Sequence, residues 1–317
     1  MTSEPRIAIL LASFQGARFL DAQLESLVAQ SYRNWRLVVS DDGSTDGTTD
    51  ILRRFAAAHP GRDIQIRQGP QKGATQNFLS MIEAVEPGEA MAWCDQDDVW
   101  RSDRLSRGIA ALAAQRGART RGFLHVTRTT ICDQALRPLR PAPLFQRSPG
   151  FANALVQACT PGNTTLVDPA GAALLKVASR GAADADVVSH DWWTYQVIAG
   201  AGGQVIRDPA QTVLYRQHPD NVSGRNDTPR AMWNRINRLG AGEYGDWLRR
   251  NTVALATNRA ALTVANGLLL DDFSAALDAT GPRAAAQLMR LGVYRQTRAG
   301  TAALLLAAAV GRLARSR

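Results

Sequence analysis

Short runs of apolar residues recur along the first hundred residues, separated by stretches in which apolar and polar residues mix. Four runs have the length and composition of buried β-strands: residues 6–12, 36–40, 63–67 and 90–94. Between the first two runs, Leu20, Leu24 and Leu27 repeat at the spacing of one helix face. The runs begin about 27–30 residues apart, which is the length of a β-α-β unit. This pattern predicts an α/β fold whose mostly parallel sheet is covered by helices on both faces.

The same reasoning extends to the rest of the chain. The further elements expected are helices at residues 46–58, 74–82 and 105–112, a strand near 123–127, a loop at 138–149, a helix, short strand, helix and helix over 151–203, and short strands at 204–206 and 212–215. Ser44 or Asp46 can cap the helix at 46–58. Beyond residue 226 the chain is rich in alanine and helical in pattern. We therefore expect two regions, residues 1–224 and residues 225–317.

Composition agrees with a packed globular chain, because 45% of the 317 residues are hydrophobic and 21% are charged. The formal net charge of +9 is unevenly distributed. Residues 1–224 carry 23 basic and 22 acidic side chains, whereas residues 225–317 carry 14 and 6. The basic character therefore belongs to the C-terminal region.

A basic region of this kind can face nucleic acid or an anionic membrane surface. The chain has no zinc finger or RNP motif and no basic patch with interleaved aromatic residues, so we expect no nucleic-acid partner. Peripheral membrane contact through the basic C-terminal region is the favoured alternative. Residues 301–313 suit either a helix at a membrane surface or an ordinary packed helix.

The sequence predicts a cytoplasmic protein, with the cytoplasmic face of the inner membrane as a second location. Cys94, Cys132 and Cys159 lie far apart without the spacing of a disulfide framework or a zinc site. The apolar stretch near the N-terminus is too short for a signal peptide, and no stretch approaches the ~18 apolar residues of a spanning helix.

Acidic residues follow two of the expected strands, where ligands bind in open α/β sheets. Asp41 and Asp42 come directly after the strand at 36–40, in the sequence SDDGSTDG. A carboxylate here can accept a hydrogen bond from the imide N–H of uracil or thymine, or from a ribose hydroxyl. The alternative is a turn whose side chains cap a helix.

The second cluster, CDQDDVW, follows the strand at 90–94 and contains Asp95 and Asp97. Two carboxylates beside a buried strand are costly unless a charge neutralises them. A divalent cation that also binds a diphosphate does so, and oxygen ligands favour Mg²⁺ or Mn²⁺. An acidic surface loop is the alternative, and it fits poorly with the neighbouring Trp93 and Trp100.

Two further motifs carry candidate chemistry. Asp191 opens a helical segment in SHDWW, where it can take a proton from a hydroxyl beside Trp192 and Trp193, or simply cap the helix. In YRQHPDN, His218 can complete a metal site and Arg216 can bind a phosphate, although a single histidine is also a common structural residue.

Together these motifs resemble the family 2 glycosyltransferases of GT-A fold. The resemblance covers about residues 5–224, through ILLASFQG, LVVSDDGSTDGT, QKGATQNF, WCDQDDVWRSDRL, SHDWW and LYRQHPDN. The DQDDVW form and its YRQH ending look like the rhamnosyltransferase-like subgroup that builds bacterial surface polysaccharides. The resemblance implies an inverting enzyme that uses a UDP- or dTDP-sugar, transferring rhamnose or another hexose to a saccharide or lipid-linked acceptor.

The resemblance also implies roles for individual residues. Asp97 and His218 would hold Mg²⁺ or Mn²⁺, and Asp191 would be the catalytic base. The donor nucleotide sugar would contact Ala12, Ser13, Phe14, Asp41, Asp42, Lys72, Asn77, Asp95 and Arg216. The acceptor would contact Thr160 and Asn163, which lie in the loop at 157–163, and Trp192 and Trp193, which follow Asp191.

The chain departs from the family pattern at two places. Phe14 stands where the family often has a tyrosine, and Gln71-Lys72-Gly73 lacks the frequent asparagine. Three other classes of protein fit the sequence less well. A phosphotransferase of the haloacid dehalogenase type needs an aspartate motif at the end of the first strand, which here reads LASF. A dehydrogenase needs GxGxxG there, and a non-catalytic sugar-binding module would not need both Asp191 and the paired carboxylates.

Overall fold

The computed structural model describes residues 4–115, 121–179, 181–182, 184–219 and 242–314. The expected boundary between residues 224 and 225, and the last residues of the YRQHPDN motif, lie outside these ranges.

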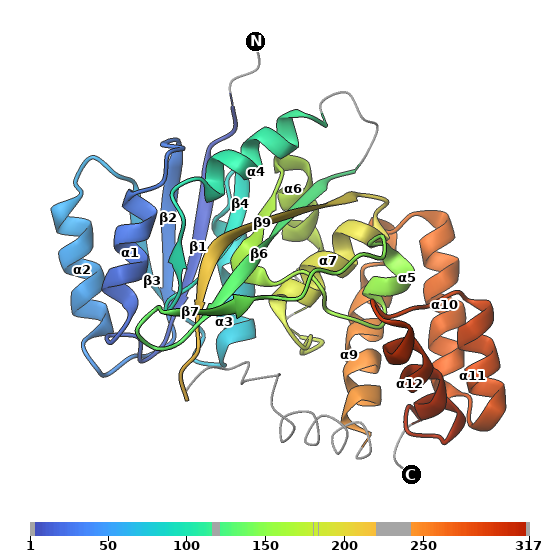
Figure 1. The fold of residues 1–317 in the computed structure, drawn as a ribbon. Helices are drawn as coiled ribbons and strands as arrows, with labels where there is room; N and C mark the ends of the chain where they lie inside the picture. The colour runs from blue at the N-terminus through green and yellow to red at the C-terminus, as the bar shows by residue number, and fades with distance from the viewer. Residues whose placement is uncertain (1–3, 116–120, 180, 183, 220–241, 315–317) are drawn as a thin grey trace.

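The centre of the molecule is a sheet with the strand order β3-β2-β1-β4-β8-β6-β9-β5, and β7 pairs with β6 beside this path (Figure 1). The strands are β1 (Ile7–Ser13), β2 (Trp35–Asp41), β3 (Ile64–Gln68), β4 (Ala90–Asp95), β5 (Val99–Trp100), β6 (Phe123–Cys132), β7 (Pro138–Pro141), β8 (Thr165–Val167) and β9 (Gln204–Arg216).

The first half of the sheet is parallel, as the β-α-β spacing predicts: β1 pairs with β2 and β4, and β2 pairs with β3. The second half is mixed. β8 is antiparallel to β4 and β6, so β6 runs in the direction of β4, and β9 is parallel to β6. Two details differ from expectation. The short strands expected at 204–206 and 212–215 form the single strand β9, and β7 lies within the segment expected to be a loop.

Helices cover both faces of the sheet. They are α1 (Leu20–Val28), α2 (Thr48–Ala58), α3 (Ala74–Met81), α4 (Arg104–Ala113), α5 (Phe151–Ala154), α6 (Pro169–Ala178), α7 (His190–Gly200), α9 (Glu243–Thr257), α10 (Val264–Asp278), α11 (Gly281–Arg290) and α12 (Arg298–Ala309). The series of helix, short strand, helix and helix expected over 151–203 appears as α5, β8, α6 and α7.

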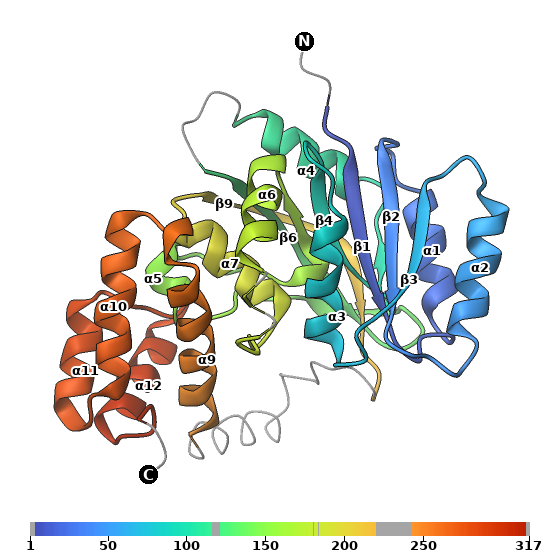
Figure 2. The same cartoon turned by 180° about the vertical axis from the view of Figure 1, so that it is seen from behind.

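Alternate residues of each central strand belong to two separate cores. In β1, Ile7, Ile9 and Leu11 pack with α1, α2 and α4 on one face, whereas Ala8 and Leu10 pack on the face of α3, α6 and α7 (Figures 1 and 2). Because successive side chains of a strand point to opposite faces, β1 must be apolar throughout. This explains its continuous apolar run.

The C-terminal helices α9–α12 extend the core on the α7 side rather than forming a separate one. Polar contacts join them to α5 and the residues after it. Tyr244 Oη donates to Val156 O at 2.5 Å, and Gln296 N donates to Gln157 Oε1 at 2.7 Å. The C-terminal region therefore supports the segment that leads to the loop at 157–163. No helix in the described ranges combines the length and the apolar run that a bilayer crossing requires.

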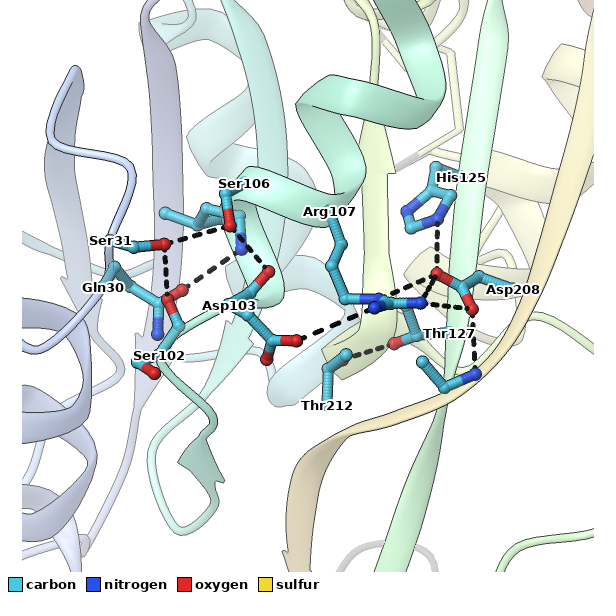
Figure 3. Close-up of polar contacts among 12 residues, drawn as sticks. Gln30, Ser31, Ser102, Asp103, Ser106, Arg107, His125, Thr127, Asp208 and Thr212 are labelled. Carbon is cyan, nitrogen blue, oxygen red and sulfur yellow. Dashed lines mark hydrogen bonds and ion pairs between the residues drawn. The ribbon is translucent and has the colours of Figure 1, made fainter. Parts of the chain in front are cut away.

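A polar network fixes α4 to β6 and β9 (Figure 3). Arg107 donates from Nε and Nη2 to the two carboxylate oxygens of Asp208, at 3.0 and 3.1 Å. His125 Nε2 lies 3.7 Å from the same carboxylate and is almost fully buried. At the start of α4, Gln30 donates to Arg101 O at 2.8 Å and accepts from Leu105 N at 3.1 Å. These contacts set the position of α4.

The network predicts a pH dependence of stability. Burial lowers the pKa of His125 to about 4 from its ordinary value of 6.5; the charge of Asp208 opposes this shift, whereas Arg104 and Arg107 add to it. Between these two values the unfolded chain binds a proton that the folded chain does not. Stability linked to neutral His125 is therefore fully present above pH 6.5. The unfolding free energy falls as the pH drops from 6.5 toward 4, because the unfolded chain gains a proton at His125.

Between about pH 7 and about pH 4 the unfolding free energy of the wild-type protein should fall. We expect it to fall less in His125→Gln, which has no imidazole to protonate. Urea denaturation at a series of pH values measures this difference. An identical pH dependence in the two proteins would contradict the assignment.

Candidate active site

The carboxyl ends of β1, β2 and β4 meet at one edge of the sheet, the lower edge in Figure 1. In the parallel register Ser13 pairs with Asp41 and Ala12 with Asp95, so the first two acidic clusters are neighbours. β9 runs in the same direction and ends there with Arg216. The edge therefore gathers the candidate residues at the place where open α/β sheets bind ligands.

Gln96 ties the turn after β4 to the end of β1. Its Oε1 accepts from Phe14 N at 2.9 Å, and its Nε2 donates to Phe14 O at 2.8 Å. Gly16 leaves room for this side chain, because a Cβ there would lie 2.1 Å from Gln96 Oε1. The ring of Phe14 is 54% exposed beside the acidic turn. Gln96 thus holds the backbone of Phe14, whose large apolar ring is exposed at this edge.

Asp97 and His218, the two expected metal ligands, are in direct contact. His218 Nε2 lies 2.7 Å from Asp97 Oδ2, and both side chains are largely buried. Arg216 Nε donates to the backbone O of Asp97 at 2.8 Å. The ring of Phe19 lies 4.8 Å from the His218 ring. The fold therefore brings together a carboxylate and an imidazole that are 121 residues apart in sequence.

These two side chains suit a cation whose remaining ligands come from a substrate. Carboxylate oxygen and imidazole nitrogen both bind Mn²⁺, and Mg²⁺ prefers oxygen. No group of three or more His, Cys, Asp or Glu side chains in the described part of the chain could hold a metal ion. A cation at Asp97 would thus need further ligands, and diphosphate oxygens and water are the usual complement for Mg²⁺.

Asp98 is fully buried, and the sequence analysis did not single it out. Its Oδ2 accepts from Asn163 Nδ2 at 2.5 Å, and its Oδ1 accepts from Arg216 N at 3.3 Å. Burial raises the pKa of Asp98 well above its usual range, and the charge of Asp97 adds to the rise. Asp98 joins the turn after β4 to β9 and to the loop before β8. Its place as the third carboxylate after a buried strand was the signal that could have identified it.

Three carboxylates share the electrostatic field of the site. Burial and, to a smaller extent, the charges of Asp97 and Asp191 raise the pKa of Asp95 to about 7, against the opposing effect of Arg104. Charges interact this strongly only when they lie close together or in a poorly solvated region. Asp191, on α7, therefore lies near enough to Asp95 for the two charges to interact.

Arg104 is the buried cation that partly balances these charges. Its Nε and Nη2 donate to Asn163 O at 3.1 and 2.8 Å, and its guanidinium carbon lies 3.5 Å from the ring centre of Trp100. Burial lowers the pKa of Arg104 to about 9. No sequence pattern indicates this role, since an arginine at the start of a helix is normally exposed.

Asp191 lies in the first turn of α7, where the helix dipole favours a negative charge. Its Oδ1 accepts from Ser189 Oγ at 2.6 Å and from Trp192 N at 2.7 Å. The loop before β8 approaches closely at Gly162, where a Cβ would lie 3.2 Å from Asp191 Cβ. Because Asn163 contacts Asp98, this loop connects Asp191 to the turn after β4.

His190, beside Asp191, is a neutral side chain packed into the core. Its ring stacks on Phe78 with 3.8 Å between the ring centres and meets Trp93 edge-on at 5.1 Å. Burial lowers the pKa of His190 to about 4. This packing fixes the start of α7 and hence the position of Asp191.

Trp192 and Trp193 do not form the sugar-stacking face expected from the sequence. Both indoles are buried, and their N–H groups donate to Ala154 O at 2.6 Å and to Ser179 Oγ at 3.1 Å. The expectation was wrong because α7 is covered on all sides, by the sheet, by α5 and α6, and by the C-terminal helices. The two tryptophans position α7.

Three other expected contact residues also serve the protein itself. Arg216 is buried and donates to Asp97 O and, at 2.5 Å, to Gln134 O. Asn163 donates into Asp98, and Thr160 is buried. Their contact with phosphate or acceptor stays a prediction.

The expected nucleotide-binding residues divide into internal and exposed ones. Asp41 accepts from Ser13 Oγ at 2.8 Å and from Ser44 N at 2.8 Å. Asp42 accepts from Gln71 N at 2.6 Å and from Gly73 N at 2.8 Å.

Asn77 donates to Ser40 O at 2.8 Å, and Ala12 is buried within β1. Phe14 and Lys72 are exposed. Arg18, which the sequence analysis passed over, is also exposed and lies 5.0 Å from the Phe19 ring centre. Arg18 thus supplies a positive charge near Asp97 and His218, and its place just after the first strand was the signal for it.

Residues 8–161 match the model of the family described as Glycosyl transferase family 2. The chain is 25% identical over 257 residues to the dTDP-rhamnosyl transferase RfbG of Shigella flexneri, covering 78% of this chain and 83% of that protein. It is 29% identical over 103 residues to the UDP-Glc:alpha-D-GlcNAc-diphosphoundecaprenol beta-1,3-glucosyltransferase WfaP of Escherichia coli, covering 32% of this chain and 39% of that protein. These matches confirm the family resemblance.

Among solved structures, the chain is similar to residues 1–349 of S. aureus TarS in complex with UDP. The TM-score is 0.54 at 13% sequence identity, and the superposition covers 97% of this chain and 89% of that one. At this identity the likeness concerns the fold alone. The GT-A fold expected from the sequence is confirmed.

The Gln96 contact generates a stability prediction. We expect Gly16→Ala to lower the unfolding free energy by about 1–3 kcal/mol, because the new Cβ displaces Gln96 from its two hydrogen bonds with Phe14. Gly61→Ala is the matched control, because no atom lies within 4 Å of a Cβ at that position. Urea denaturation measures both.

A double-mutant cycle sharpens this test. In a Gln96→Ala background, Gly16→Ala should cost little, since the displaced side chain is already gone. An equal cost in both backgrounds would show that Gly16 acts through something other than Gln96.

Proposed function

The chain belongs to glycosyltransferase family 2, and on that premise we propose that it transfers a sugar from a nucleotide diphosphate donor to an acceptor hydroxyl with inversion. The observation that carries this proposal is that Asp95 and Asp97 lie at the end of β4, while Asp191 lies beside the Gly162–Asn163 loop that contacts Asp98. Burial and the charges of Asp97 and Asp191 together raise the pKa of Asp95 to about 7. If Asp95 and Asp97 were only structural and Asp191 only a helix cap, nothing would require the three to lie in one region.

The donor is proposed to bind along the ends of β1 and β2, with its base beside the exposed ring of Phe14. Lys72 and Arg18 are exposed cations near this edge that can contact the diphosphate. A dTDP-sugar is the first candidate, because the relative with the longest match above is named a dTDP-rhamnosyl transferase. A UDP-sugar is the second, since TarS was solved with UDP.

Asp191 is proposed as the general base. Both hydrogen bonds described for its carboxylate go to Oδ1, so we assign Oδ2 to the acceptor hydroxyl. As the proton moves to Oδ2, the acceptor oxygen forms a bond to the anomeric carbon and the bond from that carbon to the diphosphate breaks. One displacement from the opposite face inverts the anomeric configuration.

Asp97 and His218 are proposed to hold Mg²⁺ or Mn²⁺ together with the donor diphosphate. A bound cation supplies positive charge that offsets the charge of the leaving diphosphate. Asp98 and Arg216 hold the turn that carries Asp97, and Gln96 fixes that turn to β1. These residues act as positioning residues.

The acceptor is proposed to be a saccharide or a lipid-linked saccharide of bacterial surface polysaccharide synthesis. The name of the WfaP relative includes a diphosphoundecaprenol-linked sugar, which supports the lipid-linked form. The backbone of the loop before β8 approaches Asp191 at Gly162, so we propose this loop as one wall of the acceptor site.

A donor screen tests the proposal without knowledge of the acceptor. We expect slow nucleotide release from dTDP-rhamnose or a UDP-sugar, and more release with Mn²⁺ than with a chelator. Purified protein is incubated with dTDP-, UDP- and GDP-sugars, and free nucleotide is measured by chromatography. No release from any donor, with or without Mn²⁺, would argue against a transferase.

Asp191→Asn tests the base. We expect the rate of sugar transfer to fall by roughly 10²–10⁴-fold, because a general base contributes that much, while the melting temperature changes little. Asp50→Asn is the matched control, since Asp50 also lies in the first turn of a helix but is exposed on α2. Near-normal turnover of Asp191→Asn removes the assignment.

A further inference from the structure

The outer surface of α11 and α12 differs from the rest of the C-terminal region in its chemistry. Every exposed residue between 281 and 314 is apolar or small or an arginine, apart from Thr297. The large apolar side chains Met289, Leu306 and Val310 are 64%, 65% and 61% exposed. We call the exposed residues of this segment the α11–α12 surface.

Helical spacing places these side chains on the outer faces of the two helices. In α12, Ala299, Ala303, Leu306 and Val310 recur at the spacing of one face, and Leu304 and Ala308 form the buried face. In α11, Ala284 and Leu288 are the buried residues. The two helices pack against each other at the outer end of the molecule (Figures 1 and 2). Their outer faces therefore carry apolar groups that the fold itself leaves uncovered.

The charge of this surface is of one sign. Residues 279–317 contain seven arginines and no aspartate or glutamate. Arg283, Arg290, Arg298 and Arg312 are exposed on it. Apolar side chains flanked by arginine are typical of helices that lie at an anionic membrane surface, because the side chains enter the lipid boundary while the guanidinium groups meet the phosphates.

We propose that the α11–α12 surface binds the surface of an anionic lipid bilayer. A second copy of this chain is a poorer occupant, because two such surfaces would bring their arginines together. In Figure 1 the C-terminal helices and the carboxyl edge of the sheet both lie toward the lower side of the molecule. Docking would bring the chain to a membrane that can carry a lipid-linked acceptor. Lipid binding itself does not depend on the proposed function. Only the role of the membrane as the source of a lipid-linked acceptor rests on it.

The neighbouring helix α10 provides an internal comparison. It also exposes large apolar side chains, Val264 at 83% and Leu268 at 57%. Its exposed face, however, carries Asp271, Asp272 and Asp278, which anionic lipid would repel. Exposure of apolar groups alone thus does not define the surface, and Leu268 serves as a matched control for Leu306.

The test is sedimentation of the full chain with vesicles of phosphatidylcholine alone and of phosphatidylcholine mixed with phosphatidylglycerol. We expect binding to the mixed vesicles only, weakened by added salt. Leu306→Asp should reduce the affinity by about tenfold or more, because it removes an inserted apolar group and adds a repelled charge. Leu268→Asp should leave the affinity within about twofold. Arg290→Gln with Arg312→Gln should weaken binding without altering the apolar residues.

Circular dichroism and nucleotide release from a donor sugar are measured on each variant. Leu306→Asp should keep both, since Leu306 is an exposed residue of α12, whereas Asp191 lies on α7. The inference is overturned if the wild-type chain ignores the mixed vesicles, if Leu268→Asp impairs binding as much as Leu306→Asp, or if centrifugation reveals a dimer that Leu306→Asp separates. Vesicle binding without nucleotide release would instead contradict the proposed function and leave this inference intact.

Discussion

Repulsion among carboxylates at the edge of a doubly covered sheet is the constraint on which the rest of the structure depends. Asp95, at the end of β4, and Asp97 and Asp98 just after it lie within four residues, and Asp191 on α7 is near enough for its charge to act on Asp95. Water cannot fully solvate charges in such a position, so the protein must supply the balance. It does so partly, with the buried guanidinium of Arg104. The remaining imbalance is what makes the edge suited to a cation and a diphosphate.

The surrounding fold can be understood as support for this unbalanced site. Gln96 and Asp98 tie the acidic turn to β1, β9 and the loop before β8. The C-terminal helices hold the segment before that loop through Tyr244 and Gln296. The same helices expose the α11–α12 surface. The C-terminal helices would thus position the wall of the acceptor site and, by our inference, bind the membrane that presents the acceptor.

Much of the fold could be predicted, because continuous apolar runs alternating with helical periodicity permit few arrangements besides a parallel sheet covered on both sides. The positions of the acidic clusters at strand ends also followed from the sequence. Side-chain roles were harder. Trp192 and Trp193 were expected to face sugar, but the sheet, α5, α6 and the C-terminal helices, which come from distant parts of the chain, bury them. Gln96 was missed because its partner, Phe14, is 82 residues away.

The central claim is that the acidic edge binds a divalent cation together with a nucleoside diphosphate, and calorimetry tests this directly. Mn²⁺ is titrated into the protein with dTDP or UDP present, and Asp97→Asn is compared with Asp103→Asn, an exposed aspartate outside the site. We expect the wild-type protein and Asp103→Asn to bind Mn²⁺ alike and Asp97→Asn to lose binding by at least about tenfold. Equal binding by all three proteins, or no binding by the wild-type protein with either nucleotide, would contradict the account.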